Sequence, residues 1–149
     1  MSFETVNAYA SIREKREAVN RLLREEIKPR TVFTVSTPPL EPNASANVYI
    51  IDAYGTYGIL NAQTNSAAWV SMYIDSNSMI RDAGRSIDND PYSNAGVVLE
   101  FITDKADIIP ISPIINGYTS TGETLIPVRV TNTGNSNISI ELTFTLLKI

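Results

Sequence analysis

The chain has 149 residues, of which 43% are hydrophobic and 19% charged, and its formal net charge is −4. This length suggests one domain, or one domain with an appendage. The chain contains neither Cys nor His, which excludes disulfides, thiolate zinc sites, Cys nucleophiles and Ser-His-Asp triads. Because the net charge is negative and no apolar run is long enough to cross a bilayer, we expect neither nucleic-acid binding nor membrane insertion.

The first thirty residues differ from the rest in charge and in turn-forming residues. Residues 1–30 hold seven basic and five acidic side chains, a balance of +2, whereas residues 31–149 hold five basic and eleven acidic ones, a balance of −6. All seven glycines, and all prolines except Pro29, lie in the second part. We therefore predict two regions, an N-terminal helical attachment segment over residues 1–29 (the leader) and a β-sandwich domain over residues 30–149.

The leader is predicted to form an amphipathic α-helix, because its large apolar residues recur mostly at intervals of three and four. This stripe consists of Phe3, Val6, Tyr9, Ile12, Val19, Leu23 and Ile27. Two helix starts compete, one at Ser2 and one at the capping box of Ser11 and Glu14, and Pro29 ends the helix. A single helix over residues 3–28 would be about 39 Å long. Its apolar face either folds back onto the β domain, associates with its own copies or docks on a partner.

From Arg30 onward, apolar and polar residues alternate between frequent turns. The predicted strands are Thr31–Val35, Asn47–Asp52, Tyr57–Ala62, Ala67–Asp75, Val97–Thr103, Ile108–Ser112, Thr124–Thr131 and Ile138–Leu147. Such a series predicts a mainly β fold, an antiparallel β-sandwich that is jelly-roll-like and has about eight strands. In the last strand, every second residue from Ile138 to Leu146 is apolar and is predicted to face the core. The fourth strand is apolar on both faces, which predicts a central or covered position.

The most polar stretch of the chain joins the fourth and fifth predicted strands. Its two arginines, Arg81 and Arg85, are expected to make structural ion pairs with Asp75, Asp88 or a neighbouring subunit. The two arginines share one face if residues 78–85 form a helical turn. Oxygen ligands also suit calcium, but the glycine and the closing glutamate of an EF-hand loop are missing.

The sequence offers two other kinds of candidate site, carboxylate pairs and exposed tyrosines. Carboxylate pairs such as Glu100 with Asp104 or Glu123 arise by chance in an acidic domain, and nothing singles one of them out. We therefore predict a protein that is not an enzyme and holds no cofactor or metal. Tyrosines near the predicted turns offer either a surface that stacks on sugars or ordinary packing at the rim of the sandwich. They are Tyr54, Tyr57, Tyr92 and Tyr118.

Several segments resemble, in composition and order, a small β domain found in virion structural proteins of tailed bacteriophages. These segments are AAWVSMYIDSNSMIRDAGRSIDNDP, NAGVVLEFIT, ISPIINGY, IPVRVTN and ISIELTFTLLKI. They include a Trp-bearing strand, a loop ending in Asp-Pro, and a last strand rich in Thr and Leu. The resemblance covers residues 67–149 and leaves out the leader. It implies a structural part of a phage particle, most naturally in the tail fibre or baseplate region, and it brings no catalytic residues.

The sequence thus predicts a virion protein, assembled in the host cytoplasm, that acts as an adaptor between particle components. Its expected partners are its own copies, as a homotrimer, and other virion proteins. The predicted interaction residues are the seven apolar residues of the leader stripe together with Trp69, Arg81 and Arg85. Two alternatives stay open, a capsid decoration (cement) protein and a receptor-binding module at a fibre tip that contacts a host-surface glycan.

Overall fold

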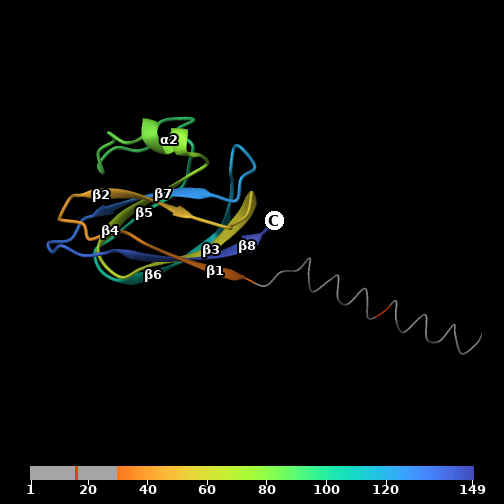
Figure 1. The fold of residues 1–149 in the computed structure, drawn as a ribbon, viewed down its shortest axis with the longest axis horizontal. Coiled ribbons are helices and arrows are strands. Elements are labelled where there is room, and N and C mark those ends of the chain that lie inside the picture. The colour runs from red at the N-terminus through yellow and green to blue at the C-terminus, as the bar shows by residue number, and fades with distance from the viewer. Residues whose placement is uncertain (1–15, 17–29) are drawn as a thin grey trace, which may run out of the picture.

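The structure, a computed structural model, describes residues 30–149 and, within the leader, Arg16 alone. The predicted leader helix and its seven stripe residues lie outside the described residues. Residues 30–149 form a β-sandwich with one short helix (Figure 1). The elements are β1 (Thr31–Ser36), β2 (Ser45–Ile50), β3 (Thr56–Thr64), β4 (Ala68–Tyr73), α2 (Ser76–Arg81), β5 (Val97–Thr103), β6 (Asp107–Tyr118), β7 (Ile126–Asn132) and β8 (Glu141–Lys148).

Two four-stranded antiparallel sheets form the sandwich. One has the order β1-β8-β3-β6 and the other β2-β7-β4-β5; we call them the β1 sheet and the β2 sheet. The strands pair as nested partners, β1 with β8, β2 with β7, β3 with β6 and β4 with β5. This nesting is what a long antiparallel hairpin gives when it is rolled up, and it defines a jelly roll. The prediction of an eight-stranded antiparallel sandwich is confirmed.

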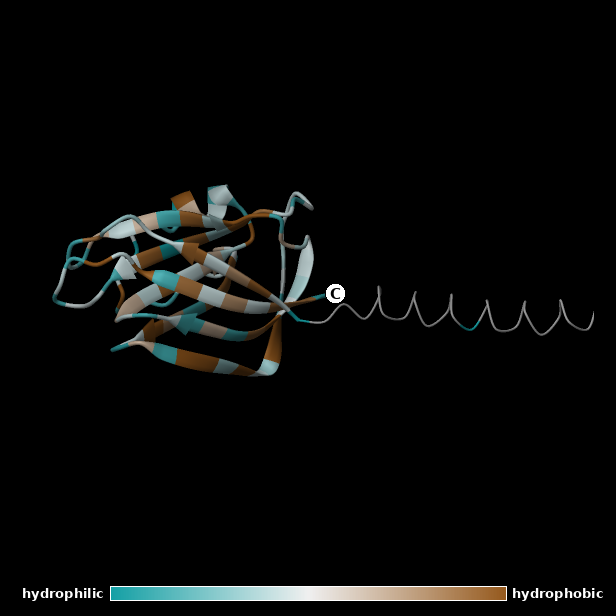
Figure 2. Ribbon diagram, turned by 60° about the horizontal axis from the view of Figure 1, so that its bottom comes forward, coloured by the Kyte–Doolittle hydropathy of each residue, from teal (hydrophilic) through white to brown (hydrophobic). Residues whose placement is uncertain are grey.

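The core lies between the two sheets and is built by alternation along each strand. In β8, Leu142, Phe144 and Leu146 are fully buried, while the residues between them are more exposed. They pack in one apolar cluster with residues of the opposite sheet such as Val70 and Val128. Figure 2 shows the resulting alternation of hydrophobic and hydrophilic bands along the strands. Each such side chain stabilises the fold by about 1.5–3 kcal/mol relative to an exposed position.

Most predicted strands differ from the observed ones at their ends, and two of the differences have a clear physical reason. The last strand begins at Glu141 and not at Ile138, because Ile138 forms an isolated bridge with Leu40 before the ladder to β1 starts. The sixth strand was expected to end at Ser112, before a proline, but β6 continues to Tyr118. It is the edge strand of its sheet, where a proline leaves no ladder partner unpaired.

The prediction for the fourth strand is confirmed in both respects. β4 lies between β7 and β5 inside its sheet. Ala68, Val70 and Met72 are buried members of the core cluster, so the alternate residues Trp69, Ser71 and Tyr73 point to the outer face. That face is covered by the connection that carries α2 (Figure 1). The second apolar face of β4 is therefore packed against the chain's own residues and is not left free for another subunit.

Candidate functional site

The connection from β4 to β5, residues 74–96, lies on the outer face of the β2 sheet, and we call it the covering segment. Its two ends are joined by a hydrogen bond from Ile74 N to the Gly96 carbonyl oxygen at 2.9 Å. Gly96 has a φ of 77°, a conformation that glycine adopts without strain. The segment is therefore closed at its base like a loop with fixed ends, and α2 stands at its start.

Helix α2 begins where Asp75 caps it. The Asp75 Oδ1 atom accepts a hydrogen bond from Ser78 N at 2.7 Å, and Oδ2 accepts one from the Ser120 hydroxyl at 2.6 Å. These bonds, the one from Ser120 foremost, lower the pKa of Asp75 below its usual value of 3.8. An aspartate at this position satisfies backbone N–H groups that the first helical turn leaves without partners. The cap also ties α2 to the β6–β7 loop through Ser120.

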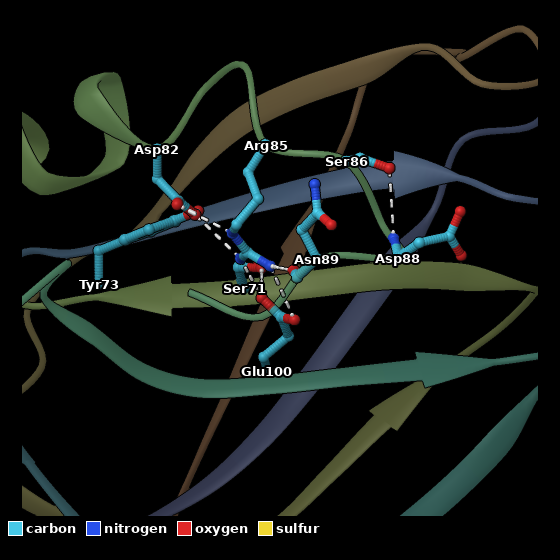
Figure 3. Close-up of polar contacts among 8 residues, drawn as sticks. All are labelled: Ser71, Tyr73, Asp82, Arg85, Ser86, Asp88, Asn89 and Glu100. Carbon is cyan, nitrogen blue, oxygen red and sulfur yellow. Dashed lines mark hydrogen bonds and ion pairs between the residues drawn. The ribbon is translucent and has the colours of Figure 1, made fainter. Parts of the chain in front are cut away.

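Arg85 is the centre of a buried ionic cluster (Figure 3). Its Nε and Nη2 atoms donate to the two Asp82 carboxylate oxygens at 2.9 and 3.0 Å. Its Nη1 and Nη2 atoms donate to the two Glu100 carboxylate oxygens, the Nη1 bond at 3.1 Å. The Arg85 and Asp82 side chains are each 3% exposed and that of Glu100 is 22% exposed. A planar guanidinium that forks onto two carboxylates in this way is strongly fixed in orientation.

Further hydrogen bonds complete the cluster. The Tyr73 hydroxyl donates to Asp82 Oδ2 at 2.6 Å, and the Ser71 hydroxyl donates to Glu100 Oε2 at 2.9 Å. Arg85 Nη1 also donates to the Asn89 carbonyl oxygen at 2.8 Å. Tyr73, Ser71 and Glu100 belong to the sheet, while the other members belong to the covering segment. The cluster therefore fastens the segment to the sheet beneath it.

The environment shifts the pKa values of these groups in consistent directions. Burial raises the pKa of Tyr73 to about 12, and its bond to Asp82 adds to the effect. Burial of the Asp82 carboxyl opposes its ionisation, but hydrogen bonds from Arg85 and Tyr73 outweigh this and lower its pKa. The hydrogen bond to Glu100 raises the pKa of Arg85 further above its ordinary value. Tyr73, Asp82 and Arg85 are thereby held in their usual charge states, which suits a structural ion cluster.

The two arginines predicted as interaction residues have different roles. Arg85 makes the structural ion pair that was expected, but with Asp82 and Glu100 in place of Asp75 or Asp88. Arg81 is exposed and donates to the Ser78 hydroxyl at 3.2 Å. The condition for a shared face, a helical turn over residues 78–85, is not met, because α2 ends at Arg81 and tighter turns run on to Arg85. The two arginines therefore do not share a helix face.

Glu100 is the member that the sequence analysis did not find. It was weighed only as one half of a chance carboxylate pair. The signal that could have found it is its position as the single charged residue in an otherwise apolar strand, VVLEFIT. A carboxylate within such a strand needs a cationic partner when it is covered, and Arg85 supplies it.

Trp69, the third predicted interaction residue, lies beside the cluster. The Arg85 guanidinium carbon is 5.2 Å from the centre of the Trp69 ring, which is a cation–π distance. Trp69 also lines a cavity of about 290 Å³ between the covering segment and the sheet. A second, more polar cavity of about 620 Å³ lies on the segment itself and is lined by residues that include Arg81 and Tyr92.

The four tyrosines near the predicted turns do not form one exposed surface. Tyr57 is fully buried in the core, where its hydroxyl donates to the sulfur of Met72. Tyr54 packs edge-on against Phe33, with ring centres 6.0 Å apart, and its hydroxyl is hydrogen-bonded to Thr31. Only Tyr92 and Tyr118 are largely exposed. Of the two alternatives, packing therefore holds for Tyr54 and Tyr57, since a tyrosine next to a glycine turn can also begin a buried strand, as Tyr57 does.

Comparisons with known proteins give no further identification. No model of a protein family matches the chain, and no curated protein matches it in sequence. Within residues 30–149, no helix has the length and apolar character needed to cross a membrane. Nor does this part of the chain bring together three or more acidic side chains in an arrangement that could hold a metal ion.

Proposed function

We propose that this protein is a structural component of a tailed bacteriophage particle, in the tail fibre or baseplate region, which joins particle components through its leader and its β domain. The observation that carries the proposal is the apolar outer face of the β1 sheet. The covering segment packs on the outer face of the β2 sheet over β4 and leaves Tyr49 and Ile102 of that sheet exposed. No described element covers the outer face of the β1 sheet, which bears several exposed large apolar side chains. Exposed apolar side chains gathered on one face are typical of protein interaction sites.

Four of the exposed apolar side chains lie toward one end of that face, while Ile108, which is 59% exposed, lies at the start of β6. Val32, on β1, is 60% exposed, and Ile149, just after β8, is 58% exposed. On β6, Ile114 and Tyr118 are also exposed. A side chain at Gly58 would lie 2.3 Å from Ile114 Cδ1 and 3.4 Å from Ile149 Cδ1, so these two isoleucines meet over Gly58. We call Val32, Ile114, Tyr118 and Ile149 the apolar end.

This end is also where the leader joins the domain. The leader precedes Thr31, the first residue of β1, and Val32 is the next residue along. The apolar end therefore lies where the leader joins the domain. Two interaction regions joined in this way suit an adaptor, with its own copies in a homotrimer and other virion proteins as partners. The jelly roll supports the proposal at the level of fold, since capsid domains of viruses use it.

A pair of matched variants tests self-association. Ile149→Asp places a charge on the apolar end, and Ile80→Asp places the same charge on α2, where the isoleucine is 63% exposed. We expect light scattering to give an oligomeric mass, a trimer in the simplest case, for the wild type and for Ile80→Asp. We expect a monomer for Ile149→Asp, because an unpaired charge in an apolar contact is costly. A monomeric wild type, or equal masses for both variants, contradicts the proposal.

Position in the particle separates the tail component from a capsid decoration protein. Purified virions from the source that encodes the chain are labelled with an antibody against it and viewed by electron microscopy. Label at the tail supports the proposal, and label over the head supports decoration instead. Virions without label contradict both functions.

A further inference from the structure

The chain's single tryptophan lies outside the hydrophobic core. The core cluster is filled by aliphatic side chains and by Tyr57 and Phe144, and it does not include Trp69. Trp69 lies on the outer face of β4 and keeps part of its surface exposed. Since a tryptophan stabilises a core more than most side chains, its position beside a partly exposed cavity is the feature to be explained.

The cavity beside Trp69 has a rigid floor and a fixed roof. The floor comes from the β2 sheet, with Trp69, Arg129 and Thr131 on it, and the roof includes Ile87 of the covering segment. Because the ionic cluster of Arg85 fastens this segment to the sheet, the cavity does not depend on a mobile loop. Its volume of about 290 Å³ is at the lower limit of ligand-binding cavities, which have about 300–1,000 Å³, so it fits one small ring and nothing larger.

The charges at the cavity balance once the ion pair of Arg85 with Glu100 is counted. Arg85, Arg129 and Asp82 line the cavity, and Glu100, which does not line it, supplies the second negative charge through its ion pair with Arg85. Arg129 Nε donates to Asn47 Oδ1 at 3.2 Å, and among residues 30–149 its terminal nitrogens have no hydrogen-bond acceptor. Those nitrogens offer donors for hydroxyl oxygens, but the balanced charge gives an ionic ligand no net attraction.

Unused polar atoms occur at the same place. Trp69 Nε1 and Thr133 Oγ1 belong to residues that line the cavity, and neither atom has a partner within the described part of the chain. Buried polar atoms of folded proteins nearly always have a partner. Together with the free donors of Arg129, they make this cavity the least satisfied polar region of the β2 sheet's outer face.

We propose that this cavity binds a single neutral pyranose sugar. The apolar C–H face of the ring packs on the exposed part of the Trp69 indole. The sugar hydroxyl groups accept hydrogen bonds from the Arg129 guanidinium. They also donate hydrogen bonds to, and accept them from, the side chains of Thr131 and Asn43 at the wall of the cavity. A few polar groups around an aromatic surface are the usual means by which a small cavity fixes a polar ligand. This site is independent of the proposed assembly function, because it lies on the opposite sheet from the apolar end.

The single tryptophan makes the test direct. Intrinsic fluorescence of the full-length protein reports on Trp69 alone, and it is followed during titration with methyl α-glucoside, methyl β-galactoside, N-acetylglucosamine and glucuronate. A ligand of about twelve non-hydrogen atoms is expected to bind with a Kd of about 1 mM. We expect a saturable change with at least one neutral sugar. No saturable change with any probe overturns the proposal, and saturation with glucuronate alone overturns the assignment to a neutral sugar.

Matched arginine variants locate the site. Arg129→Met keeps an unbranched apolar stem but removes the guanidinium donors, and we expect it to weaken binding by about tenfold or more, as the loss of a hydrogen bond from a charged group does. Arg81→Met makes the same change at an arginine that lines the neighbouring cavity and not this one, and we expect it to bind as the wild type does. Thermal unfolding checks that each variant is folded. Equal affinity of both variants overturns the assignment.

Discussion

The outer faces of the two sheets differ in how the chain treats them. On the β2 sheet, the covering segment lies over Trp69, Ser71 and Tyr73 and is fastened by Arg85 to Asp82 and Glu100. On the β1 sheet, none of the described elements covers the outer face, and apolar side chains stay exposed there. One sandwich therefore carries one face that its own residues close over β4, with Tyr49 on β2 and Ile102 on β5 left exposed, and one face that is open.

This difference allows the two sheets to serve two different tasks, ligand binding and assembly. A face fixed by a satisfied ionic network can hold a small cavity in a constant shape, which favours recognition of a small ligand. Exposed apolar side chains stabilise an assembly when another protein surface buries them. We therefore place the proposed ligand site on the β2 sheet and the proposed assembly site on the β1 sheet.

The largest loss of stability is expected when the ion pairs that hold the covering segment on the β2 sheet are removed. Arg85→Met leaves Asp82 and Glu100 facing each other without a cation. Removing one partner from a buried ion pair costs about 3–5 kcal/mol, and we expect the lower end because Glu100 keeps 22% of its side-chain surface exposed. The measurement is the free energy of unfolding in urea.

Arg81→Met is the control for that variant. Arg81 belongs to the same segment but is exposed, so we expect its removal to change stability by no more than about 0.5 kcal/mol. If the two variants unfold at the same urea concentration, the ionic cluster does not fasten the segment, and the closed face is held by packing alone.

A smaller effect is expected from two glycines of the β1 sheet that face opposite ways. A Cβ at Gly117 would lie 2.6 Å from the ring of buried Tyr57, whereas one at Gly58 would meet the end of the exposed Ile114 side chain. We expect Gly117→Ala to cost about 1–3 kcal/mol through overpacking. We expect Gly58→Ala to cost about 0.5 kcal/mol or less, because Ile114 can turn away into solvent. Similar losses for both variants in urea unfolding would mean that the outer face is as tightly packed as the core.

Much of the fold could be predicted from local patterns. Period-two alternation, as in residues 138–147, predicted where the strands lie, and turn residues predicted where they are separated. This is possible because a strand buried on one face has apolar and polar residues in alternation along the sequence. The limits of β6 could not be predicted in this way. Whether Pro113 ends a strand depends on whether that strand lies at an edge, and this is decided by the order of strands in the sheet.

The candidate site was only partly predictable for a related reason. The sequence indicated that Arg85 would be paired, since a cation among aspartates in a loop usually is. Its partner Glu100 lies on the far side of the covering segment, in β5, and meets Arg85 only because the register of β4 with β5 sets Ser71 opposite Glu100. Such a contact comes from pairing between strands, which a single sequence does not reveal.

The smallest effect concerns acid conditions on the closed face. Because the pKa of Asp82 is lowered from 3.8 in the folded protein, its contribution to stability is complete above that value and is lost as the pH falls through the folded pKa. Asp75 shifts in the same direction and adds to the loss. We expect the urea concentration at the midpoint of unfolding to decrease when the pH is lowered below about 4. Asp82→Asn should be less stable than the wild type at neutral pH, and its stability should depend less on pH in acid. Asp104→Asn, at an exposed carboxylate, should keep the wild-type profile. A wild-type slope in Asp82→Asn would show that the ionised carboxylate of Asp82 does not hold the covering segment in place.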